Sequence, residues 1–135
     1  MKYLLDSNTC IALLNDSHPG VRRRFFSHLP SDLAVCSIVK AELVYGAYRS
    51  ARVPANLQRL QTFFEPLRSL PFDDASVQTY GQLRAVLVAK GSVMGANDML
   101  IAAIGLTHRL TVVTHNTREF SRIDGLKLED WEVME

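Results

Sequence analysis

Four carboxylates interrupt segments of this 135-residue chain whose local pattern favours another residue type. They are Asp6, Glu42, Asp98 and Glu119. Asp6 directly follows the short apolar run "YLL", and Asp98 stands at the start of the apolar stretch "MLIAAIGL". Carboxylates that converge in one crevice repel each other, and a divalent cation that binds oxygen ligands offsets this repulsion. Their joint pattern therefore favours a site for Mg²⁺ or Mn²⁺.

Each carboxylate also has an ordinary structural explanation. Asp6 and the "SN" that follows it suit a turn that caps the next helix. Asp98 suits the first turn of a helix, where a negative charge contributes about 0.3–1 kcal/mol by interacting with the helix dipole. Glu42 and Glu119 have basic neighbours in the sequence and suit an exposed surface. Taken singly, Asp98 and Glu42 favour the structural explanation, and only the whole set favours a metal site.

Other common site chemistries find no support in the sequence. Cys10 and Cys36 lie in the apolar segments "NTCIALL" and "LAVCSIV", and we expect them to be buried free thiols. The four histidines have no zinc-ligand spacing. There is no glycine-rich phosphate loop and no serine in a nucleophile-elbow context. A metal site formed by acidic residues is therefore the remaining candidate.

Alternating strands and helices position these residues. The sequence predicts strands at 2–5, 33–39, 69–72 and 110–114, and an edge strand within 126–131. Helices are predicted at 9–15, 18–29, 38–50, 55–67, 75–90 and 99–108, with a turn at 116–120. This alternation predicts βαβ units and a three-layer α/β/α domain with a mainly parallel central sheet. We expect residues 1–135 to form a single domain.

Ligands of such sheets collect outside the carboxyl ends of the strands. Asp6 follows the first strand directly, and the polar cluster "THN" at 114–116 follows the strand 110–114. If these two strands are neighbours in the sheet, both clusters open into the same crevice.

Composition sets further limits on the class of protein. The chain is 47% hydrophobic and 21% charged, with a formal net charge of +1, so it lacks the strong basic excess of many nucleic-acid binders. No apolar run is long enough for a signal peptide or a membrane span, and we expect a cytoplasmic protein without a membrane partner. The run "VRRRFF" favours a solvated helix face. Tyr45, Tyr48 and Phe25 have helical spacing that favours the core over base stacking.

The chain resembles the PIN-domain toxin ribonucleases of the VapC type, the toxin half of bacterial type II toxin–antitoxin pairs. Matching stretches span nearly the whole chain. They are "YLLDSNTCIALL", "SIVKAELVYGA", "LPFDDASVQTYGQLRAVL", "GSVMGANDMLIAAIGL" and "LTVVTHNTREFSRIDGLKLEDW". The resemblance implies a PIN fold and a Mg²⁺- or Mn²⁺-dependent endoribonuclease. Such an enzyme hydrolyses RNA, with tRNA the expected substrate, and thereby inhibits translation.

The resemblance also implies roles for individual residues. Asp6, Glu42 and Asp98 correspond to the family's acidic residues, which act in catalysis and hold the metal. Ser7 and Asn8 fit the hydroxyl and amide that often follow the first Asp.

The chain departs from the family pattern after its last strong strand. Asn116 stands where many PIN domains carry a fourth Asp, and Glu119 is the candidate for the missing catalytic carboxylate. The implied partners are a cognate antitoxin, the RNA substrate and a second copy of the chain in a homodimer.

Two other functions stay open at this stage. A PIN-like module that binds RNA or a partner without cutting is favoured by Asn116, whereas the three matched acidic residues favour catalysis. A phospho-acceptor α/β domain fits less well, because it needs an acidic pair after the first strand and a lysine after a late one.

Overall fold

The computed structural model describes residues 1–133, which contain a five-stranded parallel sheet. Its strands are β1 (Tyr3–Leu5), β2 (Leu33–Cys36), β3 (Arg68–Leu70), β4 (Thr111–Val113) and β5 (Leu128–Glu129). They lie in the order β3-β2-β1-β4-β5, and each neighbouring pair is parallel. The predicted α/β class with a mainly parallel sheet is confirmed.

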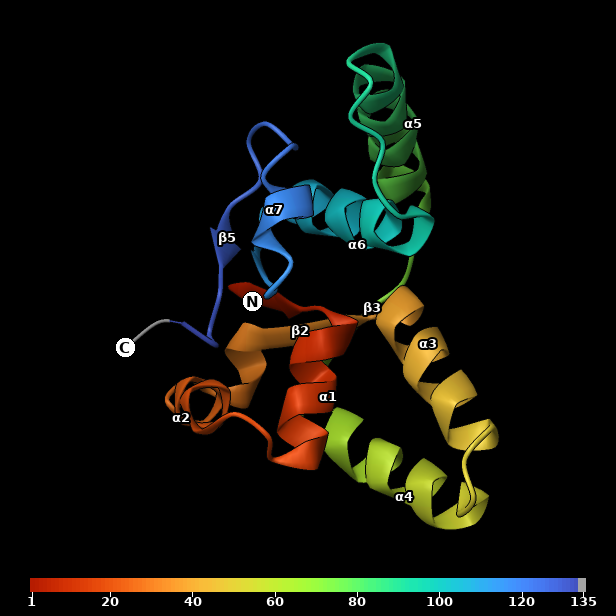
Figure 1. Cartoon of the computed structure of the whole chain (residues 1–135), viewed down its shortest axis with the longest axis vertical. Helices are drawn as coiled ribbons and strands as arrows, with labels where there is room; N and C mark the ends of the chain where they lie inside the picture. Colours follow the sequence, from red (N-terminus) through yellow and green to blue (C-terminus); the bar gives the residue numbers. More distant parts are fainter. Residues whose placement is uncertain (134–135) are drawn as a thin grey trace.

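Helices cover both faces of the sheet and complete the three predicted layers (Figure 1). One face carries α1 (Ser7–Asn15), α2 (Pro19–Phe26), α3 (Ser37–Tyr48) and α4 (Val53–Phe64). The other carries α5 (Asp74–Ala89), α6 (Ala96–Thr107) and the one-turn α7 (Thr117–Phe120). A 3₁₀ turn, η1 (Pro30–Asp32), precedes β2. From β1 the chain builds outward to β3 and then returns to place β4 on the other side of β1, which makes the β1/β4 junction the topological switch point.

The core covers both faces of the sheet, and α6, the most apolar helix, contributes much of it on one face. Met99, Ile101 and Ile104 of this helix are at most 2% exposed. Gly105 allows α6 to approach the sheet closely, because an added Cβ would lie 2.8 Å from Cγ2 of Val112 on β4. This contact anchors the helix whose first turn carries Asp98.

Several predicted boundaries were wrong in detail. The predicted strand 33–39 ends at Cys36, because Ser37 starts α3 and Val39 belongs to the buried face of that helix. A short apolar window such as 37–39 fits both patterns. The edge strand within 126–131 comprises only Leu128–Glu129, and the predicted turn at 116–120 contains the short helix α7.

Two aromatic side chains also contradict the expectation from helical spacing. Tyr45 and Tyr48 are 66% and 63% exposed, because α3 turns Val39, Leu43 and Ala47 toward the core instead. Phe25 packs against the core, as expected.

The remaining sequence expectations on burial were met. Cys10 and Cys36 are buried and free. In the run "VRRRFF", Arg22 and Arg23 are exposed, as a solvated helix face requires. Among residues 1–133, no helix combines the length and the apolar character that a bilayer span needs.

Candidate active site

Asp6 occupies the switch point of the sheet, directly after β1. Its backbone N–H donates to the carbonyl oxygen of Val113 at the end of β4 (3.1 Å), which ties the two strand ends together. Its Oδ1 accepts the backbone N–H of Thr9 at 2.9 Å and thus caps α1. The residue is only 4% exposed. Asp6 is therefore both a helix cap and a carboxylate at the predicted crevice.

Burial is the main cause that raises the pKa of Asp6 above its ordinary value. Hydrogen bonds with Thr114 and Thr9 act in the opposite direction and favour the charged form. Thr114 is fully buried, and its Oγ1 also accepts the backbone N–H of Asn116 at 2.9 Å. It therefore connects the first carboxylate to the polar segment after β4.

Asp98 lies half-buried in the first turn of α6. Burial raises the pKa of its carboxyl most, followed by the negative charges of Asp6 and Glu119 and then that of Glu42. The fold thus brings the four predicted carboxylates close enough together for the other three to repel Asp98. They come from the end of β1, from α3, from α6 and from α7.

Asn116 joins two of these carboxylates instead of adding a charge. Its Nδ2 donates to Oε2 of Glu119 at 3.0 Å and, more weakly, to Oδ2 of Asp98 at 3.4 Å. The hydrogen bond to Asp98 lowers the pKa of that carboxyl, against the effect of its acidic neighbours. The amide therefore orients both oxygens toward one crevice.

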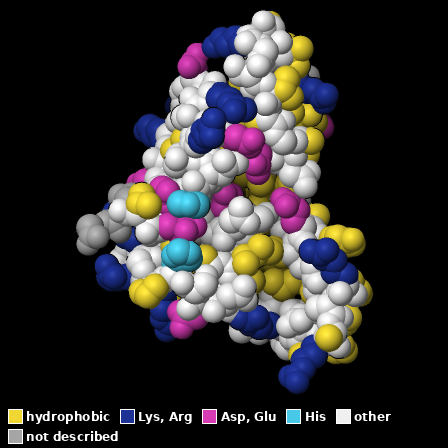
Figure 2. Space-filling view, viewed as in Figure 1, with side chains coloured by type: hydrophobic (Ala, Val, Ile, Leu, Met, Phe, Trp, Pro, Cys, Tyr) yellow, Lys and Arg dark blue, Asp and Glu magenta, His cyan; other side chains and the backbone are white. Residues whose placement is uncertain are grey.

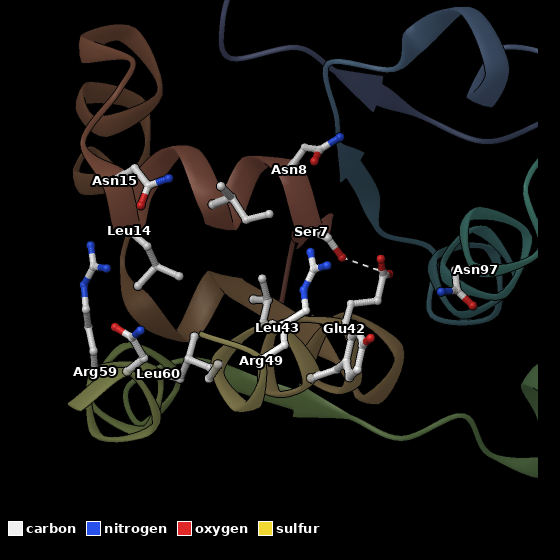
Figure 3. A pocket seen from close by; sticks show the side chains of 15 residues that line it. Ser7, Asn8, Leu14, Asn15, Glu42, Leu43, Arg49, Arg59, Leu60 and Asn97 are labelled. Carbon is white, nitrogen blue, oxygen red and sulfur yellow. Dashed lines mark hydrogen bonds between the residues drawn. The ribbon is translucent and has the colours of Figure 1, made fainter. Parts of the chain in front are cut away.

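Ser7 does the same for Glu42. Its Oγ donates to Oε1 of Glu42 at 3.0 Å, across 35 positions of sequence (Figure 3). This bond links the first turn of α1 to α3. Asn8 is exposed and lines the pocket beside this pair, so the structure brings it near Glu42.

No Lys, Arg or His within residues 1–133 forms an ion pair with any of the four carboxylates. In the same part of the chain no three Asp, Glu, His or Cys side chains are clustered tightly enough to hold a metal ion by themselves. The described residues therefore contain no preformed cage of three or more such ligands. Oxygen donors that contribute one or two direct ligands still fit Mg²⁺, which retains several waters and takes substrate phosphates as ligands.

Sequence reasoning missed two supporting groups. Thr9 and Thr114 hold the Asp6 carboxylate, yet both side chains are ordinary in their local patterns. Thr114 belongs to the polar cluster that drew attention to the end of β4, which was the available signal. Thr9 gave no signal in the sequence, because its role depends on the contact between β1 and β4. Its Oγ1 donates to the carbonyl oxygen of Val113 at 3.1 Å.

Comparison with known proteins shows which family the chain belongs to. The sequence model of the PIN domain matches residues 3–126. The chain belongs to the PIN-domain family. It is 38% identical to the "tRNA(fMet)-specific endonuclease VapC" of Salmonella typhimurium over 131 residues, which cover 97% of this chain and 98% of that protein. It is 36% identical to "Ribonuclease VapC2" of Rickettsia felis, covering 98% and 99%.

Solved structures place this PIN domain among the VapC toxins. DNA-bound VapBC from Salmonella typhimurium superposes with a TM-score of 0.91 at 38% identity and covers 97% of this chain and 98% of that chain. VapBC2 from Rickettsia felis, bound to a DNA fragment from its promoter, gives 0.90 at 34% identity, covering 97% and 99%. The chain is therefore a PIN-domain protein of the VapC ribonuclease type, from toxin–antitoxin systems.

Proposed function

We propose that this protein is the toxin of a VapBC pair and acts as a divalent-metal-dependent endoribonuclease on tRNA. One observation carries the proposal: four carboxylates gather at the switch point of the sheet without a cationic partner in residues 1–133. Relatives that cover nearly the whole chain are named ribonucleases, which supports the RNA substrate.

In this proposal Asp6 and Asp98 hold the cation directly, and Glu42 orients the rest of its ligand shell. Bound Mg²⁺ or Mn²⁺ supplies charge stabilisation at the scissile phosphate and a lower pKa for the attacking water. Hydrogen bonds within the chain hold the carboxylates in position to bind the cation. Thr9 and Thr114 fix the Asp6 carboxylate.

Glu119 contributes the fourth carboxylate of the site, and two neutral residues position it and Glu42. Asn116 aligns Glu119 with Asp98, and Ser7 aligns Glu42. Glu119 orients the water that attacks the phosphorus in line. The reaction adds this water across the phosphodiester and leaves a 5′-phosphate and a 3′-hydroxyl. Asn8, which is exposed beside Glu42, contacts the RNA from the edge of the site.

The substrate and partners follow from the relatives. Since the Salmonella typhimurium relative is named for tRNA(fMet), initiator tRNA is the first substrate to examine. The VapBC complexes support a cognate antitoxin as partner. We further propose a homodimer of single-domain chains that acts in the cytoplasm and inhibits translation.

The test is cleavage of tRNA(fMet) and of total tRNA by purified, antitoxin-free protein, with Mg²⁺ or Mn²⁺ and with EDTA. We expect discrete fragments with 5′-phosphate ends that disappear with the chelator and with Asp6→Asn. Fragments that persist in EDTA would contradict the metal requirement. If tRNA, rRNA and mRNA all stay intact while RNA still binds, the protein is a non-catalytic module.

A further inference from the structure

A pocket of about 520 Å³ adjoins the acidic crevice, between α1, α3 and α4. Ser7 and Glu42 lie at one end of it, so the pocket is continuous with the candidate active site (Figure 3). Its floor is apolar and includes Leu14, Leu43 and Leu60. Figure 2 shows this hollow as an apolar patch below the central acidic side chains, with Lys and Arg around it. We call it the α1/α3/α4 groove.

One stripe of α3 leads from the acidic crevice along this groove. Glu42, Tyr45, Gly46 and Arg49 all line it, at the spacing i, i+3, i+4 and i+7 that places residues on one helix face. Because a helix rises about 1.5 Å per residue, Glu42 and Arg49 stand roughly 10 Å apart along its axis. A substrate anchored at the carboxylates reaches Arg49 by following this stripe.

Gly46 is not explained by the packing of the protein itself. It lies in the interior of α3, where glycine is less stable than alanine. A Cβ at this position would meet nothing within 4 Å. Gly46 thus leaves the helix backbone open to the groove, as a binding site for a closely approaching ligand requires.

The groove carries the cations that the acidic crevice lacks. Arg49 and Arg59 both line it, extending from α3 and α4 in Figure 3. The Arg49 guanidinium lies 5.5 Å from the ring centroid of Tyr45, which is 66% exposed. An exposed aromatic ring beside a guanidinium is a typical platform for an unpaired base, and arginine also binds phosphate in a bidentate manner.

We propose that the α1/α3/α4 groove holds an unpaired nucleotide adjoining the scissile phosphate of the RNA. Arg49 binds the phosphate of this nucleotide, Arg59 supports it electrostatically, and the open backbone at Gly46 accommodates its sugar and base. Continuity with the carboxylates and the two guanidinium groups favour RNA over an apolar peptide. The proposal rests on the proposed function, since it assumes that RNA is cut at the acidic crevice.

Blocking variants with a matched control test this assignment. Gly46→Leu fills the groove, whereas Gly81→Leu places the same side chain on α5, at another helical glycine where an added Cβ would meet nothing within 4 Å. Arg49→Gln removes the guanidinium and keeps the backbone that ends α3. The measurements are kcat and KM for tRNA(fMet) cleavage, binding of fluorescent tRNA(fMet) in EDTA, and binding of the cognate antitoxin.

We expect Gly46→Leu and Arg49→Gln to weaken tRNA binding and raise KM about 10- to 100-fold, the size of a lost charge-assisted contact. Gly81→Leu should match the wild type in both. Unchanged KM and binding in Arg49→Gln, or in a Gly46→Leu that keeps its thermal transition, would overturn the proposal. Loss of antitoxin binding alone would assign the groove to the partner peptide.

The binding measurement separates the two proposals. If the wild type cuts no RNA but binds tRNA, and Arg49→Gln weakens that binding, the proposed enzymatic function fails while the groove assignment holds. If the wild type cuts tRNA and both variants behave like it, only the groove assignment fails.

Discussion

Two groups of acidic side chains lie near the carboxyl ends of β1, β4 and β5, and they are neutralised in different ways. Asp130 and Glu132 are 12% and 18% exposed, and each has a histidine partner. His115 Nδ1 lies 2.9 Å from Asp130 Oδ2, and His18 Nε2 lies 3.1 Å from Glu132 Oε1. The other group, Asp6, Glu42, Asp98 and Glu119, forms no ion pair within the described residues 1–133.

The difference supports the proposal that only the second group binds a cation from outside the chain. The Asp130 pair raises the pKa of His115, so the protein itself supplies the compensating charge there. At the crevice, burial and then the repulsion of the neighbouring carboxylates raise the pKa of Asp98, and neutral groups such as Asn116 supply the hydrogen bonds. An unpaired acidic cluster is costly in the apoprotein and becomes favourable when a cation binds.

The largest expected effect comes from removing a charge of the unpaired group. Asp98→Asn keeps the shape of the side chain but takes away a proposed direct ligand. We expect tRNA cleavage to fall by roughly a thousandfold or more, because a catalytic metal contributes several kcal/mol. Initial rates of tRNA cleavage by the wild type and the variant, with Mg²⁺ and with Mn²⁺, measure this loss. Cleavage within tenfold of the wild type would show that Asp98 is not a ligand.

A smaller loss should follow from removing the amide that orients the carboxylates. Asn116→Ala deletes the hydrogen bonds to Glu119 and Asp98 but leaves every charge in place. We expect activity to fall about 10- to 100-fold, as is typical for a residue that positions metal ligands. Titration of activity with Mn²⁺ checks this. A positioning role predicts that more Mn²⁺ is needed for half-maximal activity, whereas an unchanged requirement contradicts it.

The sequence predicted the crevice well because strand ends determine it. Asp6 and the cluster 114–116 each follow a buried strand, and parallel pairing of β1 with β4 brings them together, as expected. The four carboxylates were found for a different reason, because each stands where the local pattern favours another residue. Their proposed catalytic roles stay predictions.

The hydrogen bonds that organise the site were beyond sequence reasoning. Ser7 meets Glu42 across 35 positions, and Asn116 meets Asp98 across 18, so neither contact has a local signal. The same is true of Tyr45 and Tyr48, because helical spacing does not reveal which face of α3 meets the core. These contacts and the exposed face of α3 depend on the tertiary fold, which local sequence patterns do not determine.

Asp98→Asn should raise the stability of the apoprotein although it lowers the activity. The pKa of Asp98 is raised in the folded state, so its charge destabilises the fold above the unfolded pKa, and stability falls as pH rises from there through the folded pKa. Asp98→Asn should therefore stabilise the metal-free protein near neutral pH by on the order of 1 kcal/mol or less, because solvent screens the repulsion at a half-exposed carboxylate. Thermal unfolding in EDTA measures it.

Addition of the divalent ion is the control for this stabilisation by Asp98→Asn. Mn²⁺ should raise the transition temperature of the wild type and remove the advantage of the variant, which has lost a ligand. Well below the ordinary Asp pKa of about 3.9 the two proteins should unfold alike in EDTA, since Asp98 is then protonated in both states. An Asp98→Asn protein that is less stable at neutral pH would show that the repulsion is already relieved in the apoprotein.

The smallest expected effect concerns the self-neutralised group. The hydrogen bond to Asp130 raises the pKa of His115, followed by the charges of Glu132 and Asp130. Its contribution to stability is therefore complete below the unfolded pKa of about 6.5 and is lost as pH rises through the higher folded value. Because His115 is 56% exposed, His115→Gln should cost only about 0.2–1 kcal/mol near pH 6 and nothing at alkaline pH.

Urea unfolding of the wild type and His115→Gln across this pH range measures the difference, and Asp130→Asn provides the second arm of a double-mutant cycle. The coupling between the two substitutions should vanish on the alkaline side and should not respond to Mn²⁺. A coupling that depends on Mn²⁺ would mean that both acidic groups respond to one ion. The contrast between a group that neutralises itself and a group that needs a cation would then be wrong.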